Sequence, residues 1–375
     1  MTARKRIVCT KPAAYLSAGI IDPRMHKRTR RSRSEKLRFA ALAAPLVILL
    51  LVSSCGLVHN KVEVEKLLTP LAEANTPDLI ATVNKMVSVR SIHGRVDIQF
   101  EDTSFATSGI SEKYRTADGS ITLQRPGKVY LIIQAPFVAA DIVQMTSDGE
   151  HFRIAILKGD EKFRRFVKGT NNAVYPKLDM DGDSSPGGDK KSKNSEAQTV
   201  NALSNLRPQH LTDALLLKPI DTHAAGIFYA QSEAFESEKD PSKADSNKRI
   251  VRGYYLLDEL QPSTDNTAHL LRRFWFDRVG GIRLARLQSF NEQGVLVNDV
   301  SYGPLTKFGA EGNASMPAKI SLTRPQEHYK ISITYQTPES LTIDKDYADE
   351  AFVLTNKWNL TEVDLDVKKS SPPKN

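Results

Sequence analysis

The sequence predicts a single α+β domain, built on a meandering antiparallel sheet of roughly a dozen strands with two helical segments. Three segments alternate apolar and polar residues, as strands with one buried face do: 95–100, 120–124 and 330–335. Turn dipeptides separate the candidate strands, namely Asp118-Gly119, Asp148-Gly149, Gly280-Gly281 and Gln293-Gly294. Because most connections are short, we expect neighbouring strands to pair antiparallel.

Composition and charge narrow the function. The chain has 375 residues, 40% of them hydrophobic and 26% charged, which excludes collagen-like and wholly disordered classes. Residues 1–54 contain 12 of the 52 basic residues but only Asp22 and Glu35 of the 44 acids. The rest has 40 basic against 42 acidic residues, a balance of −2. Because the basic excess lies in one terminal segment, we expect no nucleic-acid partner.

Residues 1–54 have the organisation of an export signal. A basic stretch from Arg24 to Arg38 precedes a run without charges from Phe39 to Val52. A membrane crossing needs about 20 apolar residues, whereas the core of a signal peptide needs roughly 7 to 15. The sequence therefore predicts a signal peptide over 1–54. Met25 offers an alternative start, which would place the first 24 residues outside the protein.

The end of this segment suggests lipidation. Val52, Ser53, Ser54 and Cys55 resemble the lipobox of bacterial lipoproteins. The resemblance implies cleavage before Cys55, a diacylglycerol on its thiol and an acyl chain such as palmitate on its new amino group. Two or more chains anchor a protein stably to a membrane. Gly56, rather than Asp, favours the outer membrane, facing the periplasm. The alternative, an uncleaved signal anchor with a free cysteine, fits the short apolar run less well.

The mature chain is expected to begin with a tether over 55–75 and to continue as one domain over 76–355. Thr76 is a candidate N-cap with Pro77 at the first helical position. Apolar residues then recur at spacings of three and four: Leu79, Ile80, Val83, Met86 and Val87. These features predict a helix over 77–89. Residues 356–375 are expected to form a C-terminal tail.

Three internal segments interrupt the strand pattern. Residues 178–195 are polar and glycine-rich, and residues 232–248 are highly charged, so both are predicted to be disordered insertions. Residues 201–217 are rich in leucine and are broken by Arg207-Pro208. Because the residue before a proline disfavours helix, this segment predicts two short helices packed on the sheet.

Short motifs follow one another in a fixed order along the chain. They are Gly94 with Phe100; Gly119-Ser120-Ile121-Thr122-Leu123-Gln124-Arg125-Pro126; Ala135-Pro136; Ser147-Asp148-Gly149; Phe274-Trp275-Phe276-Asp277; Gly294-Val295-Leu296; Pro317-Ala318-Lys319-Ile320; and Phe352-Val353-Leu354. This order resembles the LolA/LolB-like family of bacterial lipoprotein-sorting and lipid-binding lipoproteins. The resemblance covers about residues 77–354.

The resemblance implies an open antiparallel half-barrel of about 11 strands, whose concave face is covered by helices. Acyl chains would bind between the two, and the candidate cavity residues are Val96, Ile98, Phe100, Ile121 and Leu123. Arg125 matches an arginine of the family that latches the covering helices by bonding to their carbonyl groups. The alternative is a surface arginine before a turn proline. A tightly filled interior at the cavity positions would argue against acyl binding.

Motifs for chemistry are missing from the sequence. It contains no HExxH, CxxC or GxSxG motif, and it predicts no metal, cofactor or catalytic residue. Asp179, Asp181 and Asp183 are spaced as in a calcium loop, but Ser184 and Lys190 replace its glycine and glutamate. We therefore expect a binding protein rather than an enzyme.

Together these observations predict a monomeric, lipid-anchored envelope protein that binds acyl chains of lipids or lipoproteins, for lipoprotein sorting or lipid trafficking. Two alternatives remain open. One is a sensor or scaffold of the same fold that recognises protein partners. The other, less favoured, is an envelope hydrolase, which would place paired carboxylates in a polar cleft.

Overall fold

The structure is a computed structural model of the whole chain. It describes residues 64–103, 112–113, 116–135, 140–159, 161, 164–171, 173, 207–240, 242, 248–264, 267–312 and 314–369. The chain divides into two units, Met1–Val64 and Glu65–Asn375, and the description below concerns the second. The predicted signal peptide, Cys55 and the insertion over 178–195 lie outside the described residues. Among the residues that are described, no helix has the length and apolar character needed to cross a membrane.

Strands dominate the described residues. The strands are β1 (Lys66–Leu67), β2 (Ser91–Asp102), β3 (Glu112–Lys113), β4 (Ala117–Gln124), β5 (Lys128–Gln134), β6 (Asp141–Ser147), β7 (His151–Ile156), β8 (Arg165–Thr170), β9 (Phe228–Lys239), β10 (Arg249–Pro262), β11 (Ala268–Asp277), β12 (Arg283–Phe290), β13 (Leu296–Tyr302), β14 (Leu305–Phe308), β15 (Ala314–Pro317), β16 (Lys319–Arg324), β17 (Tyr329–Tyr335), β18 (Thr342–Ile343) and β19 (Thr361–Asp364). The helices are α2 (Thr76–Val87), α4 (Pro208–Leu215) and α5 (Leu365–Lys369), with 3₁₀ turns η4 (Pro338–Ser340) and η5 (Asp349–Phe352).

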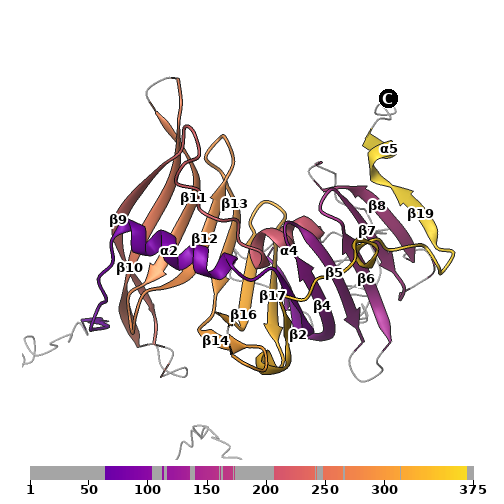
Figure 1. The fold of residues 1–375 in the computed structure, drawn as a ribbon, viewed down its shortest axis with the longest axis horizontal. Helices are drawn as coiled ribbons and strands as arrows, with labels where there is room; N and C mark the ends of the chain where they lie inside the picture. The colour runs from indigo at the N-terminus through magenta and orange to yellow at the C-terminus, as the bar shows by residue number, and fades with distance from the viewer. Residues whose placement is uncertain are drawn as a thin grey trace, which may run out of the picture. The chain divides into compact units, whose positions relative to one another are not determined.

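One large sheet organises the fold (Figure 1). Strand pairing runs from β9 through β10, β11, β12, β13, β16, β17, β2, β4, β5, β6, β7 and β8 to β19. No pairing joins β9 to β19 within the described part of the chain, so the sheet is open. The prediction of an open sheet is confirmed, whereas the described residues are mostly strand with few helices rather than an even mixture of helix and strand. The described residues contribute 17 strands to this sheet, whereas about 11 were expected.

The purely antiparallel prediction is wrong at two places. Strand β1 pairs parallel with β10, with Lys66 opposite Ile250, and β19 pairs parallel with β8, with Thr361 opposite Arg165. Both strands come from segments that were expected to be a tether and a tail. The 65–75 part of the expected tether instead packs against the sheet, where the Ala72 N–H also donates to the Arg278 carbonyl. The expected tail contains β19 and α5.

The predicted disordered insertion over 232–248 is also wrong in its first half. Strand β9 runs along β10 from Phe228, opposite Leu260, to Lys239, opposite Arg249. The acidic side chains that suggested a loop are ion-paired, because Glu238 lies 2.6 Å from Arg252 and Glu233 lies 2.9 Å from Arg278. A strand at the edge of a sheet keeps one face in water and therefore tolerates such a charged sequence.

Local signals explain the first helix. Asn75 caps α2 by accepting a hydrogen bond from the Asp78 N–H, and the Asp78 side chain accepts one from the Asn75 N–H. This reciprocal capping box satisfies two amide groups at the helix start, and Pro77 occupies the first turn. The predicted helix over 77–89 is confirmed within two residues at its C-terminal end, although the cap is Asn75 rather than Thr76. Of the two helices predicted over 201–217, α4 is observed, and 201–206 lie outside the described residues.

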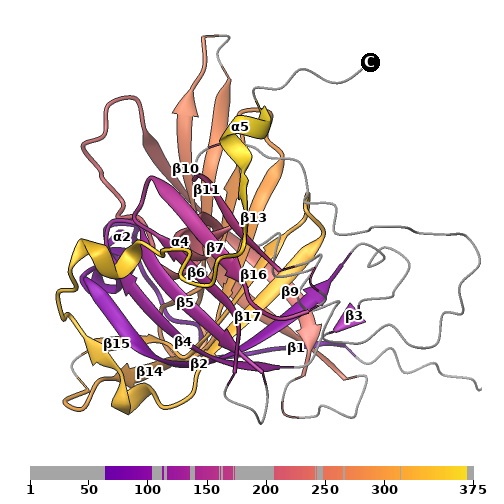
Figure 2. The same cartoon turned by 90° about the vertical axis from the view of Figure 1, so that its right-hand side faces the viewer.

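The larger of two hydrophobic clusters among the described residues lies between the sheet and the two helices. Helix α2 contributes Leu79, Val83 and Met86, and α4 contributes Leu211 and Leu215. Helix α2 contacts β9 and β12, while α4 contacts β5, β6 and β16 (Figures 1 and 2). The two helices thus cover different parts of the same apolar face of the sheet.

Candidate functional site: a helix-covered apolar core

The five candidate cavity residues lie next to one another on β2 and β4. Gly94 pairs with Ile121 and Ile92 with Leu123, so the inward side chains of the two strands share one face. Val96, Ile121 and Leu123 are 0% exposed, Ile98 is 2% exposed and Phe100 is 6% exposed. All five belong to the core that α2 and α4 cover. The structure therefore brings the five residues together, but the covering helices bury them in a filled interior, which argues against acyl binding in this closed arrangement, so binding requires the helices to move.

Arg125 lies between the two covering helices. Its Nε donates to the carbonyl of Val89, two residues beyond α2, at 2.9 Å. One of its terminal nitrogens donates to the carbonyl of Leu217, two residues beyond α4, at 2.7 Å. Burial lowers the pKa of the Arg125 guanidinium. A single side chain from the end of β4 thus bonds to the segments that follow both helices, where helix carbonyls lack intrahelical partners.

Two further side chains hold the segment over 216–221 that follows α4. Asn84 of α2 donates to the Ile220 carbonyl at 3.1 Å and accepts from the Ile220 N–H at 2.9 Å. Arg272 of β11 donates to the Lys218 carbonyl at 3.3 Å and also bonds to Glu259. Sequence reasoning missed both residues, because their partners are backbone groups of a distant segment.

Helix α4 itself has two polar ties to the sheet. The Tyr302 hydroxyl of β13 donates to the Ala214 carbonyl at 3.2 Å. His210 Nδ1 and the Tyr329 hydroxyl of β17 lie 2.6 Å apart. The His210 side chain keeps some contact with solvent, but protein atoms surround most of its ring. Burial, reinforced by the nearby guanidinium groups of Arg324 and Arg207, lowers the pKa of His210 to about 3.

Tyr335 introduces a polar atom into the same core. Its side chain is 2% exposed and packs edge-on against Phe308, with 5.1 Å between ring centroids. Within the described residues, its hydroxyl has no hydrogen-bond partner. Burial accordingly raises the pKa of Tyr335.

Replacing Tyr335 with Phe is expected to increase the free energy of unfolding by about 1 kcal/mol, because a buried hydroxyl without a partner costs about 1–3 kcal/mol. Denaturant unfolding of both proteins measures this difference. Tyr302→Phe is the matched control: it removes a hydroxyl that bonds to Ala214, and we expect it to lower stability. Equal losses of stability in the two variants would contradict the role assigned to the Tyr335 hydroxyl.

Acid–base or metal chemistry is not evident in this core. Among the described residues, no group of three or more His, Cys, Asp or Glu side chains is placed to hold a metal ion. Asp179, Asp181 and Asp183 lie outside those residues. The core cluster that α2 and α4 cover consists of apolar side chains and a few tyrosines. Such a surface offers contacts to hydrocarbon rather than groups that transfer protons.

Neither a protein-family profile nor a curated protein sequence matches this chain. Three solved structures are similar to it. A LolA superfamily protein from Nitrosomonas europaea has 9% identity and a TM-score of 0.36, covering 75% of this chain and 99% of its own. A DUF1329 family protein from Desulfovibrio piger has 11% identity and a TM-score of 0.36, with coverages of 74% and 95%.

The third structure is described as an outer membrane lipoprotein-sorting protein domain, from Vibrio parahaemolyticus. It has 9% identity and a TM-score of 0.37, and the match covers 74% of this chain and 97% of that one. At these identities and scores, the similarity does not assign a function. The chain is thus similar to solved structures that include a LolA superfamily protein and a lipoprotein-sorting domain.

Proposed function

We propose that this protein is a non-enzymatic envelope lipoprotein that binds acyl chains of lipids or lipoproteins between its sheet and its covering helices. In this proposal, Cys55 anchors a monomer to the outer membrane, facing the periplasm. The sheet acts as a half-barrel whose concave face receives the hydrocarbon. Lipoprotein sorting and lipid trafficking are the processes that such binding would serve.

One observation supports the proposal most directly. Helices α2 and α4 cover one apolar face, and the chain segments that follow them are tied by a few hydrogen bonds of Arg125, Asn84 and Arg272. The helices pack on the sheet through apolar contacts, and such contacts are not directional. The polar ties hold the segments that follow the helices, and two further bonds, from Tyr302 and Tyr329, hold α4 itself.

The free energies of the contacts decide whether an acyl chain can displace the covering helices. Transfer of a sixteen-carbon chain out of water is worth on the order of 12 kcal/mol. Each neutral hydrogen bond of the cover contributes about 0.5–1.5 kcal/mol net, and a bond from a charged group about 1.5–3 kcal/mol. The buried apolar side chains of α2 and α4 contribute about 1.5–3 kcal/mol each, so the incoming acyl chain offsets the helix contacts that it replaces. The bonds of Arg125 then set how often the cover opens.

Arg125→Leu is expected to accelerate both association and dissociation of a fluorescent sixteen-carbon fatty acid by about fivefold. The variant loses two charged hydrogen bonds of about 1.5–3 kcal/mol each, and we expect part of this stabilisation to be lost already when the cover opens. Stopped-flow fluorescence of the full-length protein measures both rates. Arg125→Lys retains the charge but not the paired donors, so we expect intermediate rates.

Arg95→Leu is the control for this experiment. Arg95 lies on the neighbouring strand β2 and bonds to Gln336, away from the helices. Wild-type rates in Arg125→Leu would remove Arg125 from the opening step but leave acyl binding intact. No saturable binding of the fatty acid to the wild-type protein would reject the proposed function.

A further inference from the structure

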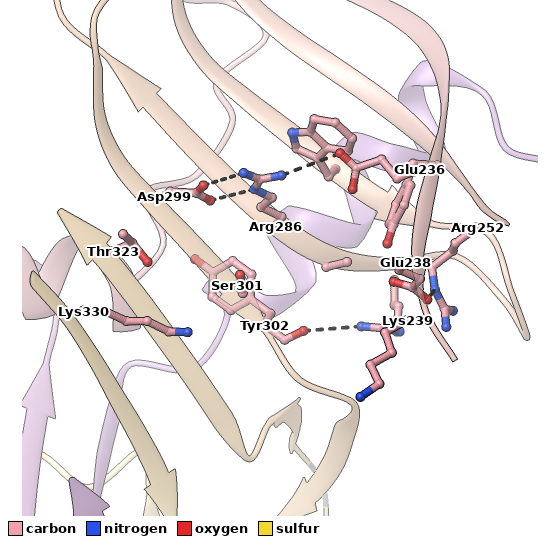
Figure 3. Close-up of a pocket in the computed structure, with 14 residues that line it drawn as sticks. Glu236, Glu238, Lys239, Arg252, Arg286, Asp299, Ser301, Tyr302, Thr323 and Lys330 are labelled. Atoms are coloured by element: carbon pink, nitrogen blue, oxygen red, sulfur yellow. Dashed lines mark hydrogen bonds and ion pairs between the residues drawn. The ribbon is translucent and has the colours of Figure 1, made fainter. Parts of the chain in front are cut away.

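A polar pocket lies on the opposite face of the sheet from α2 and α4. Side chains alternate along a strand, so the residues next to the core residues Val300, Leu322 and Ile331 point away from the core. These outward residues include Asp299 and Ser301 of β13, Thr323 of β16 and Lys330 of β17. Together with residues of β9, β10, β11 and β12, they line a pocket of about 480 Å³ (Figure 3).

The three arginines that line the pocket are already paired with carboxylates. Arg286 forms a two-pronged pair with Asp299, at 2.7 and 2.5 Å. Arg252 bonds to Glu238 at 2.6 Å, and both Arg252 and Arg283 bond to the buried Asp277, at 2.9 and 2.6 Å. These pairs fix the walls of the pocket and leave few of their donors available to a ligand.

Two ammonium groups and two hydroxyls of the lining remain available. Lys330 and Lys239 form no ion pair or hydrogen bond within the part of the chain that the structure describes, and neither do the hydroxyls of Ser301 and Thr323. Figure 3 shows Lys330 reaching from β17 toward the space beside Ser301 and Tyr302, with Lys239 on the other side. Thr323 is directly opposite Lys330 in the strand register.

The charge of the lining also favours an anion. It contains five cations, Lys239, Arg252, Arg283, Arg286 and Lys330, and three carboxylates, Glu236, Glu238 and Asp299; with the buried Asp277 that Arg252 and Arg283 share, the balance is +1. Trp275 and Tyr254 form the apolar part of the wall, where their rings pack edge to face at 5.6 Å. A partly enclosed site with low-dielectric walls strengthens the attraction between its free ammonium groups and an oxyanion.

We propose that this pocket binds a phosphate group, with Lys330 as its cationic contact and the hydroxyls of Ser301 and Thr323 as neutral donors. Phosphate oxygens accept hydrogen bonds from ammonium and hydroxyl groups, and lysine binds phosphate as a point charge. The phosphate belongs either to a soluble phosphate ester or to a lipid headgroup. Because the site lies on the far side of the sheet, it does not depend on the acyl-binding proposal.

Titration calorimetry of the full-length protein with inorganic phosphate, at constant ionic strength, tests this proposal. We expect saturable binding that weakens about fivefold or more in Lys330→Gln and is largely restored in Lys330→Arg. The chain has two tryptophans, and Trp275 lines the pocket whereas Trp358 does not. Phosphate is therefore expected to change the tryptophan fluorescence of the wild type but not that of Trp275→Phe.

Lys319→Gln is the matched control. Lys319 begins β16 on the same face as Thr323, and it is four residues away, about 13 Å along a strand. It does not line the pocket. We expect Lys319→Gln to change phosphate affinity by less than about twofold, because it removes the same charge from the same face without removing a contact. Equal losses in Lys319→Gln and Lys330→Gln, or no saturable binding to the wild type, would overturn the proposal.

Two further probes distinguish a soluble phosphate ester from a lipid headgroup as the source of the phosphate. Competition with glycerol 3-phosphate tests a soluble ester, and flotation with phosphatidylglycerol vesicles, compared between wild type and Lys330→Gln, tests a lipid headgroup. Either Lys330-dependent result supports the site and assigns its source. If neither probe depends on Lys330, the assignment to these phosphate classes is wrong.

Discussion

Asp277→Asn is expected to lower the free energy of unfolding by about 3 kcal/mol or more, since breaking a buried ion pair from one side costs about 3–5 kcal/mol. The Asp277 side chain is 1% exposed and accepts hydrogen bonds from Arg252 and Arg283 through one oxygen. Its other oxygen accepts from the Val279 N–H at 2.9 Å. Asparagine can keep only the Val279 bond, and its amide would face two guanidinium groups with a donor.

Denaturant unfolding of Asp277→Asn measures this loss, and Asp258→Asn provides the comparison. Asp258 of β10 also pairs with an arginine through two oxygens, at 2.7 Å each to Arg273, but this pair is more exposed. Partly exposed pairs contribute about 0–1 kcal/mol, so the control should lose no more than that. A similar loss in both variants would show that burial of Asp277 does not set its contribution.

Asp277 also connects fold stability to the phosphate pocket. Arg252 and Arg283 line the pocket, but both are directed toward this one carboxylate. The arginines therefore serve as structural walls, and the available charge in the pocket comes from the lysines. Because the carboxylates pair with the arginines, the lysines of the pocket lining keep their donors free, even though the lining contains many ion pairs.

The strands were predictable from the sequence where one face packs on the core and the other face is in water. The alternation over 95–100, 120–124 and 330–335 identified parts of β2, β4 and β17, because a side-chain period of two survives in the sequence whenever the opposite face is wet. Pro77 likewise located the start of α2, since a proline in the first helical turn acts only through its immediate neighbours, although the cap is Asn75 rather than the predicted Thr76.

The edges of the sheet were not predictable in the same way. The sequence of strand β9 resembles a charged loop because the partners of its carboxylates are not nearby in the sequence. Glu238 pairs with Arg252, and Glu233 pairs with Arg278, which is 45 residues away. Strands β1 and β19 are two and four residues long, too short for any period to emerge. Their position depends on backbone pairing with β10 and β8, and backbone pairing does not require particular amino acids.

The candidate site shows the same division. Arg125 was identified through its Arg-Pro motif, and the structure places its donors against the carbonyls of Val89 and Leu217. Asn84 and Arg272 were missed because a backbone carbonyl is available at every residue, so no sequence pattern marks it as their partner. Whether Arg125 works as a latch remains a prediction.

Lowering the pH from 7.5 to 5 is expected to weaken the attachment of α4 by about 30-fold, or about 2 kcal/mol, through His210 alone. The folded protein holds the pKa of His210 at about 3, whereas a free imidazole titrates near 6.5. A depressed histidine pKa means that the folded state favours the neutral ring. The stabilisation is thus complete above about pH 6.5 and is lost as the pH falls from there toward about 3.

The charged groups around His210 decide how this effect must be measured. Arg324 and Arg207 repel the protonated ring, and the ring contacts the Tyr329 hydroxyl. On the same helix, burial raises the pKa of Asp213, so protonation of that carboxyl opposes the effect at the acidic end. The difference between the wild type and His210→Gln isolates His210, because the contribution of Asp213 is common to both proteins.

We expect the unfolding free energy of the wild type to fall by about 2 kcal/mol more than that of His210→Gln between pH 7.5 and pH 5. Hydrogen exchange of the amides in α4 then distinguishes local release from global unfolding. If α4 is the moving cover, its amides should lose protection at pH 5 before those of β4 and β5, after correction for intrinsic exchange. Parallel pH profiles for the two proteins would show that the pKa of His210 does not differ between the folded and released states, which would exclude it as the source of acid sensitivity.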